Sequence, residues 1–205
     1  GKDIASGAKD TDNGKPGSEY NTADNGMKPN RITTAEGKVY ELVPASTKGD
    51  ETGTVESGQT KEVTYVYKEV KGNVVVHYTD EAGNKIAEDA KDTTDGSIST
   101  PYNTSDNGMK PERITTPEGK VYQLVPTATK GAENGTVAEG TTEVTYVYKE
   151  VTGDVVVHYV DTEGNVIAED KEDTKGASLN AKYDTTDNKP EKIEKDGTVY
   201  YLTAK

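Results

Sequence analysis

The sequence predicts a mainly β protein, with a β-rich α+β fold as the alternative, in which one small domain is repeated along the chain. Residues 20–43 and 102–125 are identical at 20 of 24 positions, and the motifs VTYVYKEV and VVVHY each recur after 81 residues. Segments that recur at this long spacing and are nearly identical indicate tandem copies of one domain. Valine and tyrosine alternate in short runs between turn residues, and no segment shows the 3.6-residue period of a helix. We therefore expect function to lie in the repeated domain and not in a single active site.

Composition narrows the classes of function. The net charge of -13 over 205 residues disfavours binding to nucleic acid or to anionic membranes. Cysteine is absent, which excludes disulfides and thiolate metal sites. Aliphatic residues are as scarce as in disordered chains, but their alternating placement favours folded domains. The 13 tyrosines are expected to provide the large apolar side chains of small, thin cores.

The repeat divides the chain into three parts. Residues 72–152 form the complete repeat, residues 1–71 a first repeat without its opening VVVHY strand, and residues 153–205 a third without its closing VTYVYKEV strand. We expect a monomer. Strand exchange through the incomplete terminal repeats is the alternative, because unpaired sheet edges invite pairing with another chain. Joints of two or three residues predict an elongated array.

The elements of the complete repeat follow from turn chemistry. Residues 81–84, EAGN, form a hairpin turn in which glycine supplies the positive φ, and residues 117–119, PEG, form a second. The proline- and glycine-rich stretch from Pro101 to Pro111 is expected to be loop. The predicted strands are Asn73–Asp80, Lys85–Ala90, Arg113–Thr116, Lys120–Val125 and Glu143–Val151.

These residues resemble a known family. GNVVVHYTDEAGNKIAED from Gly72 and GDVVVHYVDTEGNVIAED from Gly153 are similar to the opening of mucin-binding protein (MucBP) repeats and of the related streptococcal surface repeats (SSURE). TEVTYVYKEV, residues 142–151, is similar to their closing segment. Residues 102–126, YNTSDNGMKPERITTPEGKVYQLVP, are nearer the streptococcal fibronectin-binding repeats.

The resemblance implies a β-grasp-like (ubiquitin-like) fold and a cell-wall-anchored adhesin of a Gram-positive bacterium, with signal and anchor outside this chain. It implies host glycoproteins as partners: fibronectin, plasminogen or mucin. Multivalent weak sites would do the binding; a non-binding stalk that projects an adhesive head is the alternative. No cofactor, metal or catalytic activity is expected, because no catalytic motif is present.

Candidate ligand-binding residues come from the loop that the first two repeats share. An exposed methionine and arginine on a loop are typical of recognition surfaces. A structural role is the favoured alternative, with methionine over the core and arginine paired with a local acid such as Glu112 or Glu118. The candidates are Met27, Lys28, Arg31, Met109, Lys110 and Arg113.

Two further motifs are weaker candidates. His77 and His158 occupy equivalent positions, but one histidine per repeat favours a place on the less buried face of a strand over a metal site. The turns that follow Asp80 and Asp161 have a faint likeness to calcium loops. They lack the spacing and the closing glutamate of such loops, so a hairpin turn is favoured.

Overall fold

The computed structural model describes residues 1–203, and it confirms a mainly β protein with three short 3-10 helices in that range. Among the described residues, no helix has the length and apolarity to cross a membrane. The chain divides into two compact units, and the division passes through the middle repeat. Unit 1 comprises Gly1–Val76, Asp89–Met109 and Gly131–Val144, and unit 2 comprises His77–Glu88, Lys110–Lys130 and Thr145–Lys205.

The first repeat forms two small sheets, in which β1 pairs with β4 and the order of the other sheet is β2-β3-β5. Residues 4–14 match residues 86–96 of the middle repeat, yet they form no strand. The strand that would pair with them has no counterpart in residues 1–71, and an isolated strand leaves its backbone groups unpaired. The elements are β1 (Glu19–Asn21), β2 (Arg31–Thr33), β3 (Val39–Leu42), η1 (Pro44–Ser46), β4 (Thr52–Thr54) and β5 (Tyr67–Glu69).

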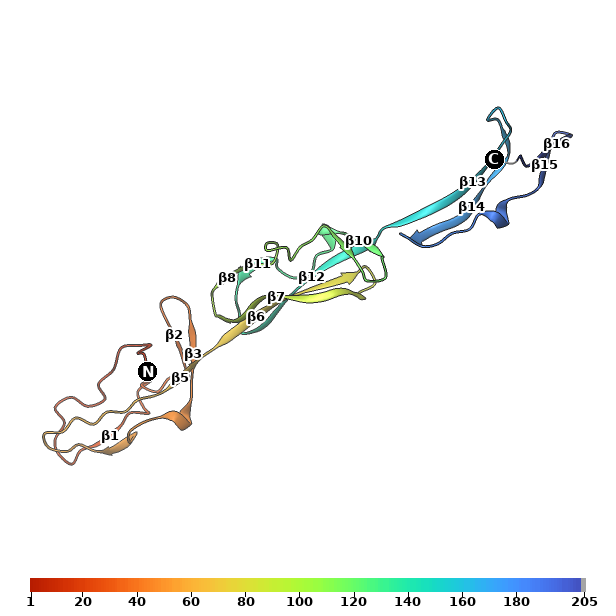
Figure 1. The fold of residues 1–205 in the computed structure, drawn as a ribbon. Helices are drawn as coiled ribbons and strands as arrows, with labels where there is room; N and C mark the ends of the chain where they lie inside the picture. Colours follow the sequence, from red (N-terminus) through yellow and green to blue (C-terminus); the bar gives the residue numbers. More distant parts are fainter. Residues whose placement is uncertain (204–205) are drawn as a thin grey trace. The chain divides into compact units, whose positions relative to one another are not determined.

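The middle repeat forms a five-stranded sheet of order β7-β6-β12-β10-β9 (Figure 1). The expectation of a loop from Pro101 onward is wrong at its start, because residues 101–103 form a strand that pairs with residues 134–136. The repeat therefore has seven strands where five were predicted. The elements are β6 (Lys71–Asp80), β7 (Lys85–Ser97), β8 (Pro101–Asn103), β9 (Arg113–Thr115), β10 (Val121–Leu124), η2 (Pro126–Ala128), β11 (Asn134–Thr136) and β12 (Gly140–Glu150).

The third repeat contains two separate hairpins, β13–β14 and β15–β16, each a two-stranded sheet (Figure 1). Their equivalents in the middle repeat, β6–β7 and β9–β10, belong to one sheet that β12 joins. The elements are β13 (Thr152–Val160), β14 (Val166–Ser178), η3 (Thr186–Asn188), β15 (Lys192–Lys195) and β16 (Thr198–Tyr201).

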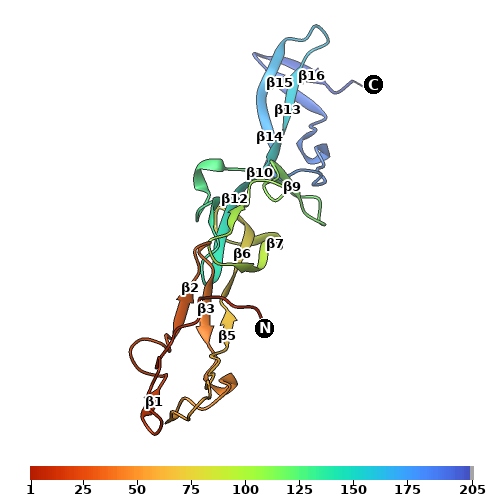
Figure 2. The same ribbon diagram turned by 90° about the vertical axis from the view of Figure 1, so that its left-hand side faces the viewer.

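Each compact unit contains a junction between consecutive repeats. In unit 1 the Ser97 hydroxyl donates to Glu69 at 2.5 Å, and the Ser99 hydroxyl donates to the Gly37 carbonyl at 3.3 Å. In unit 2 the equivalent bonds join Ser178 to Glu150 and Asn180 to Gly119. The hydroxyl of Ser97, together with the nearby Lys71, holds the pKa of Glu69 below its ordinary value. One residue separates the closing strand from the next opening strand at both junctions, between β5 and β6 and between β12 and β13 (Figure 2).

Buried side chains concentrate in the middle repeat. In unit 1, Val74, Tyr102 and Val137 pack together with Ile98 beside them. In unit 2, the Tyr78 ring lies 6.4 Å from each of the Tyr146 and Tyr148 rings, centroid to centroid. Tyrosines are the largest fully buried side chains, as the sequence predicted. The buried hydrophobic residues are Val74, Val76, Tyr78, Tyr102, Tyr122, Val137, Val144, Tyr146, Val147, Tyr148 and, in the third repeat, Ile167.

Candidate functional site

The shared loop of the first two repeats is a tight turn. Asn25 and Gly26 have φ of 51° and 74°, and Asn107 and Gly108 have φ of 50° and 75°. Two successive left-handed residues make the turn that Asn-Gly favours. The amide of the following methionine closes each turn, at 3.0 Å from the Asp24 or Asp106 carbonyl. Both methionine side chains are half-buried. In the third repeat the loop is two residues shorter, and the 3-10 helix η3 replaces the turn.

The two candidate lysines lie beside tyrosine rings. The Lys28 ammonium is 5.4 Å from the centroid of Tyr65 and 2.5 Å from a Glu51 oxygen. The hydrogen bond to Glu51 raises the pKa of Lys28. The Lys110 ammonium is 5.3 Å from the centroid of Tyr146. Cation–π contacts of this kind stabilise a site by about 0.5–2 kcal/mol.

The two candidate arginines differ in their partners. Arg31 makes a bidentate ion pair with Glu139 at 2.9 and 3.0 Å, and that contact raises the pKa of Arg31 and lowers the pKa of Glu139. Arg113 donates to the Gln123 side chain at 2.7 Å. Arg31 also lies 3.8 Å from a carboxylate oxygen of Glu41, a local acid on the paired strand, as the structural alternative expected. Glu112 and Glu118, the acids named from the sequence, are not the partners described for Arg113. Both arginines are exposed.

The Asp80 and Asp161 carboxylates accept hydrogen bonds within the hairpin turns. One oxygen of Asp80 accepts the amides of Ala82 at 2.9 Å and of Asn84 at 2.8 Å, and the other accepts the Asn84 side chain at 2.9 Å. The same set recurs around Asp161. Donation from Asn84 is the largest cause that holds the pKa of Asp80 below its ordinary value. The favoured hairpin-turn assignment is confirmed.

The histidines lie on the opening strands. His77 is half-buried in β6, and His158 is exposed in β13, with its Nδ1 2.8 Å from an Asp170 oxygen. Within residues 1–203, no group of three or more histidine, aspartate or glutamate side chains is arranged to hold a metal ion.

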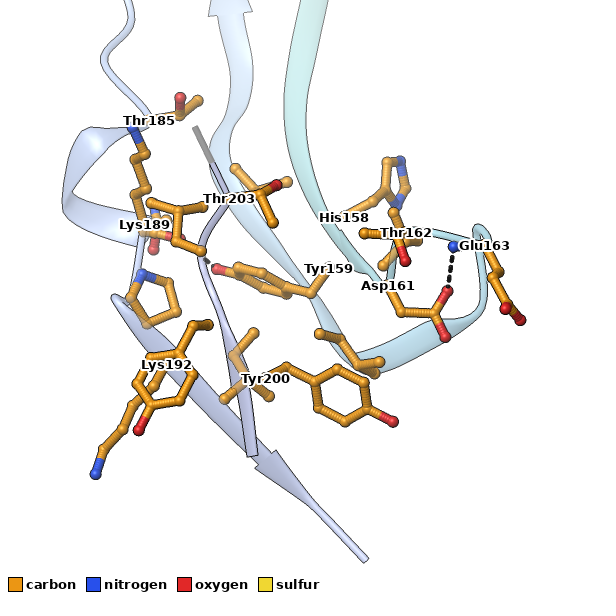
Figure 3. Close-up of a pocket in the computed structure, with 18 residues that line it drawn as sticks. His158, Tyr159, Asp161, Thr162, Glu163, Thr185, Lys189, Lys192, Tyr200 and Thr203 are labelled. Atoms are coloured by element: carbon orange, nitrogen blue, oxygen red, sulfur yellow. Dashed lines mark hydrogen bonds between the residues drawn. The ribbon is translucent and has the colours of Figure 1, made fainter. Parts of the chain in front are cut away.

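A pocket of about 650 Å³ lies in the third repeat between β13 and the β15–β16 hairpin. Figure 3 shows the Tyr159 side chain extending across it from β13, and its hydroxyl donates to the Asn188 carbonyl at 2.5 Å. Apolar side chains of both hairpins line it, among them Val157, Ile167 and Ile193. No motif of the sequence indicates this pocket, because the strands that line it are far apart along the chain.

Comparison with known proteins agrees with the repeat structure. The MucBP domain family matches residues 1–68, 73–149 and 154–205. A relative, the muramidase-released protein of Streptococcus suis, is 42% identical over 173 residues. That alignment covers 74% of this chain and 14% of the relative, so the chain spans about a seventh of that protein's length. Because the family matches nearly the whole chain in three successive segments, this chain belongs to the MucBP domain family.

Proposed function

We propose that this chain is the repeat region of a bacterial surface adhesin that binds a host matrix or mucus glycoprotein through multivalent weak sites. The observation that supports this best is the match of all three repeats to a mucin-binding family. Linked copies convert weak contacts into useful avidity. The proposed partners are fibronectin, plasminogen or mucin, and the proposed role involves no catalysis.

The proposed location is the bacterial cell surface, with anchoring to the wall in the parent protein. The name of the Streptococcus suis relative states that muramidase releases it, and a muramidase cuts the glycan of the cell wall. A surface location also agrees with the absence of cysteine and with the strongly acidic composition.

The proposed binding surface is the shared loop with its arginine. Arg31 and Arg113 are exposed at the same position of two repeats, where a repetitive ligand would meet them twice. A planar guanidinium suits sulfate or carboxylate groups of a glycoprotein, which it contacts with two parallel hydrogen bonds. Arg31 would exchange its bond with Glu139 for one with the ligand.

A non-binding stalk is the second candidate. It is favoured by the internal contacts of the same residues, since Lys28, Lys110 and Arg31 each have a partner within the chain. A side chain that is already paired must lose that contact before it binds a ligand.

Surface plasmon resonance of the 205-residue chain over immobilised mucin, fibronectin and plasminogen distinguishes the adhesin from the non-binding stalk. Arg31→Gln and Arg113→Gln should each weaken binding modestly. The affinity of the double variant should fall by about tenfold or more, because two linked sites act together. Lys175→Gln, an exposed position in the third repeat, serves as the control. If the chain binds none of the three proteins, the result favours the non-binding stalk. If the double variant binds as tightly as the unchanged chain, the shared loop and its arginine are not the binding surface.

A further inference from the structure

Asparagine is followed by glycine at four places in the chain, residues 13–14, 25–26, 107–108 and 134–135. In this dipeptide the glycine amide nitrogen can attack the side-chain carbonyl carbon of asparagine, because glycine has no side chain that obstructs the approach. A cyclic succinimide forms and ammonia leaves. Water then opens the ring at either of its carbonyls and yields aspartate or isoaspartate. The reaction requires an accessible asparagine and a glycine amide that is not held by another hydrogen bond.

The shared loop of the first two repeats meets both requirements. Asn25 and Gly26 are exposed, and so are Asn107 and Gly108. A Cβ on either glycine would have no atom within 4 Å, so the space around each glycine is open. The hydrogen bond that closes each turn comes from the methionine amide, one residue further along. Within residues 1–203, neither glycine amide donates to a backbone carbonyl, so both amides are available for the attack.

The dipeptide at residues 134–135 lies in β11 and does not meet the second requirement. β11 pairs with β8, and Gly135 lies opposite Tyr102. The Thr104 amide donates to the Glu133 carbonyl, and hydrogen-bonded pairs alternate along an antiparallel ladder, so the Gly135 amide donates to the Tyr102 carbonyl. The tyrosine ring also covers the glycine, because a Cβ there would lie 3.2 Å from the ring hydroxyl. Asn134 itself is exposed, so this site differs from the loop sites at the glycine.

The third repeat offers a second comparison. Asn188 is the equivalent of Asn107, and a lysine follows it in place of glycine. The side-chain amide of Asn188 donates to Asp173 at 3.0 Å and to Asp187 at 3.1 Å. The lysine side chain obstructs the approach of its own amide, and the two hydrogen bonds hold the asparagine side chain in place. Asn188 is therefore an unreactive counterpart of the loop asparagines.

We propose that Asn25 and Asn107 are sites of non-enzymatic deamidation, so that the shared loops change with the age of the protein while Asn134 and Asn188 stay asparagine. The nitrogen of the side-chain amide leaves as ammonia, and the oxygen of one water molecule takes its place. No oxidant, reductant or enzyme takes part, and the glycine amide of the same chain is the nucleophile.

The product adds a negative charge where each turn already holds a carboxylate. The Asn25 side-chain amide donates to the Asp24 carboxylate at 2.6 Å, and the Asn107 side-chain amide donates to Asp106 at 2.7 Å. After the reaction a second carboxylate replaces the donor, and the two like charges repel each other. Isoaspartate also lengthens the main chain of the turn by a methylene, which breaks the geometry of the bond that closes it. The turn should therefore open as the protein ages.

All of these sites can be measured in one sample. The chain of 205 residues is incubated at mildly alkaline pH and body temperature and then mapped by tandem mass spectrometry of its peptides. Deamidation at Asn25 and Asn107 should be faster than at Asn134 by about tenfold or more, because the sheet must open before the Gly135 amide can react. Asn13 lies in a segment without a strand and is the reference for a reactive site.

Guanidinium chloride provides the control for local sequence. In the unfolded chain β8 and β11 no longer pair, so Asn134 should react as fast as Asn107. Asn188 should remain the slowest of the three, because its neighbour is lysine in either state.

A double variant tests the opening of the turn. Asn25→Gly combined with Asn107→Gly removes both reacting amides and keeps the turn, which Gly-Gly also favours. Hydrogen exchange of the Met27 and Met109 amides reports on the bond that closes each turn. Their exchange should become faster by about tenfold or more in the aged chain, and it should not change in the aged double variant.

The inference does not depend on the proposed host ligand, because the reaction needs only the loop and water. Equal rates at Asn107 and Asn134 in the folded chain would overturn it, since pairing in the sheet would then give no protection. Reaction at Asn13 without reaction at Asn25 and Asn107 would overturn it as well, because the tight turn itself would then protect the asparagine. Deamidation of both loops without faster exchange at the methionine amides would overturn the opening of the turn.

Discussion

The middle and third repeats share their opening strand, hairpin turn and second hairpin, yet only the middle one has a buried core. Tyr102 is 8% exposed, and its equivalent Tyr183 is 63% exposed. Within the described residues, the third repeat shows no counterparts of β8, β11 and β12. Burial of the shared side chains goes with these three strands, whereas both hairpins form without them.

The largest expected loss of stability comes from removing the central tyrosine of the middle repeat. Tyr78 is buried against Tyr146 and Tyr148, whereas its equivalent Tyr159 lines the pocket. Tyr78→Ala should lower the free energy of unfolding by about 3–4 kcal/mol, in the range for an aromatic residue removed from a core. Tyr159→Ala should cost about 1 kcal/mol, because its ring is only half-buried. Urea unfolding followed by circular dichroism measures both, and equal losses would contradict the difference in burial between the two rings.

A smaller loss of stability than at Tyr78 is expected at Gly72, the opening glycine of the middle repeat. A Cβ on Gly72 would lie 1.8 Å from the Ala138 carbonyl oxygen, a backbone atom that cannot move aside. A Cβ on Gly153 would meet only Leu179, at 3.9 Å. Gly72→Ala should therefore cost about 2–3 kcal/mol through overpacking.

Gly153→Ala is the matched control for that substitution. It should be neutral or stabilise by up to about 1 kcal/mol, because alanine restricts the unfolded chain and meets no obstacle in the fold. Thermal melts of the two variants give the comparison directly. A clear loss for Gly153→Ala would contradict the open space that the structure shows around this residue.

The smallest effect is expected where the two repeats do not differ. The Asp80 and Asp161 carboxylates both have a lowered pKa, caused first by donation from Asn84 or Asn165. A lowered pKa stabilises the fold above the unfolded value of about 3.9, and this contribution disappears as the pH falls through the folded pKa.

Asp80→Asn and Asp161→Asn should each make acid unfolding below about pH 4 slightly less steep, and by the same amount. Midpoints of urea unfolding between neutral and acid pH give this slope. A difference between the two variants would contradict the view that the turn is independent of the closing strand.

Sequence reasoning located the long hairpins but missed the short strands. Three consecutive valines and the turn after Asp80 indicate β6 and its partner, although β7 continues past Ala90 to Ser97. The pairing of β8 with β11 depends on residues about 30 positions apart that carry few β-forming side chains. Residues 4–14 show the converse, since the similar residues 86–96 form a strand where a partner is present and residues 4–14 do not.

The candidate site was predictable in its positions and unpredictable in its contacts. The shared loop, its turn and the exposed arginines follow from Asn-Gly and from the repeat itself. The pairing of Arg31 with Glu139, 108 residues away, depends on the packing at a junction between repeats. The pocket depends on how β13 and the β15–β16 hairpin approach each other, which no local pattern describes.

The direction of the terminal strands has a mechanical consequence. The chain enters the middle repeat at the start of β6 and leaves it at the end of β12, two neighbouring strands that run the same way. Tension on a surface protein would therefore pull these strands past each other along their length. All the hydrogen bonds between them would share the load at once, whereas strands pulled apart from one end break their bonds singly. The middle repeat should therefore resist extension in a single-molecule pulling experiment more strongly than the β13–β14 and β15–β16 hairpins, which form separate sheets.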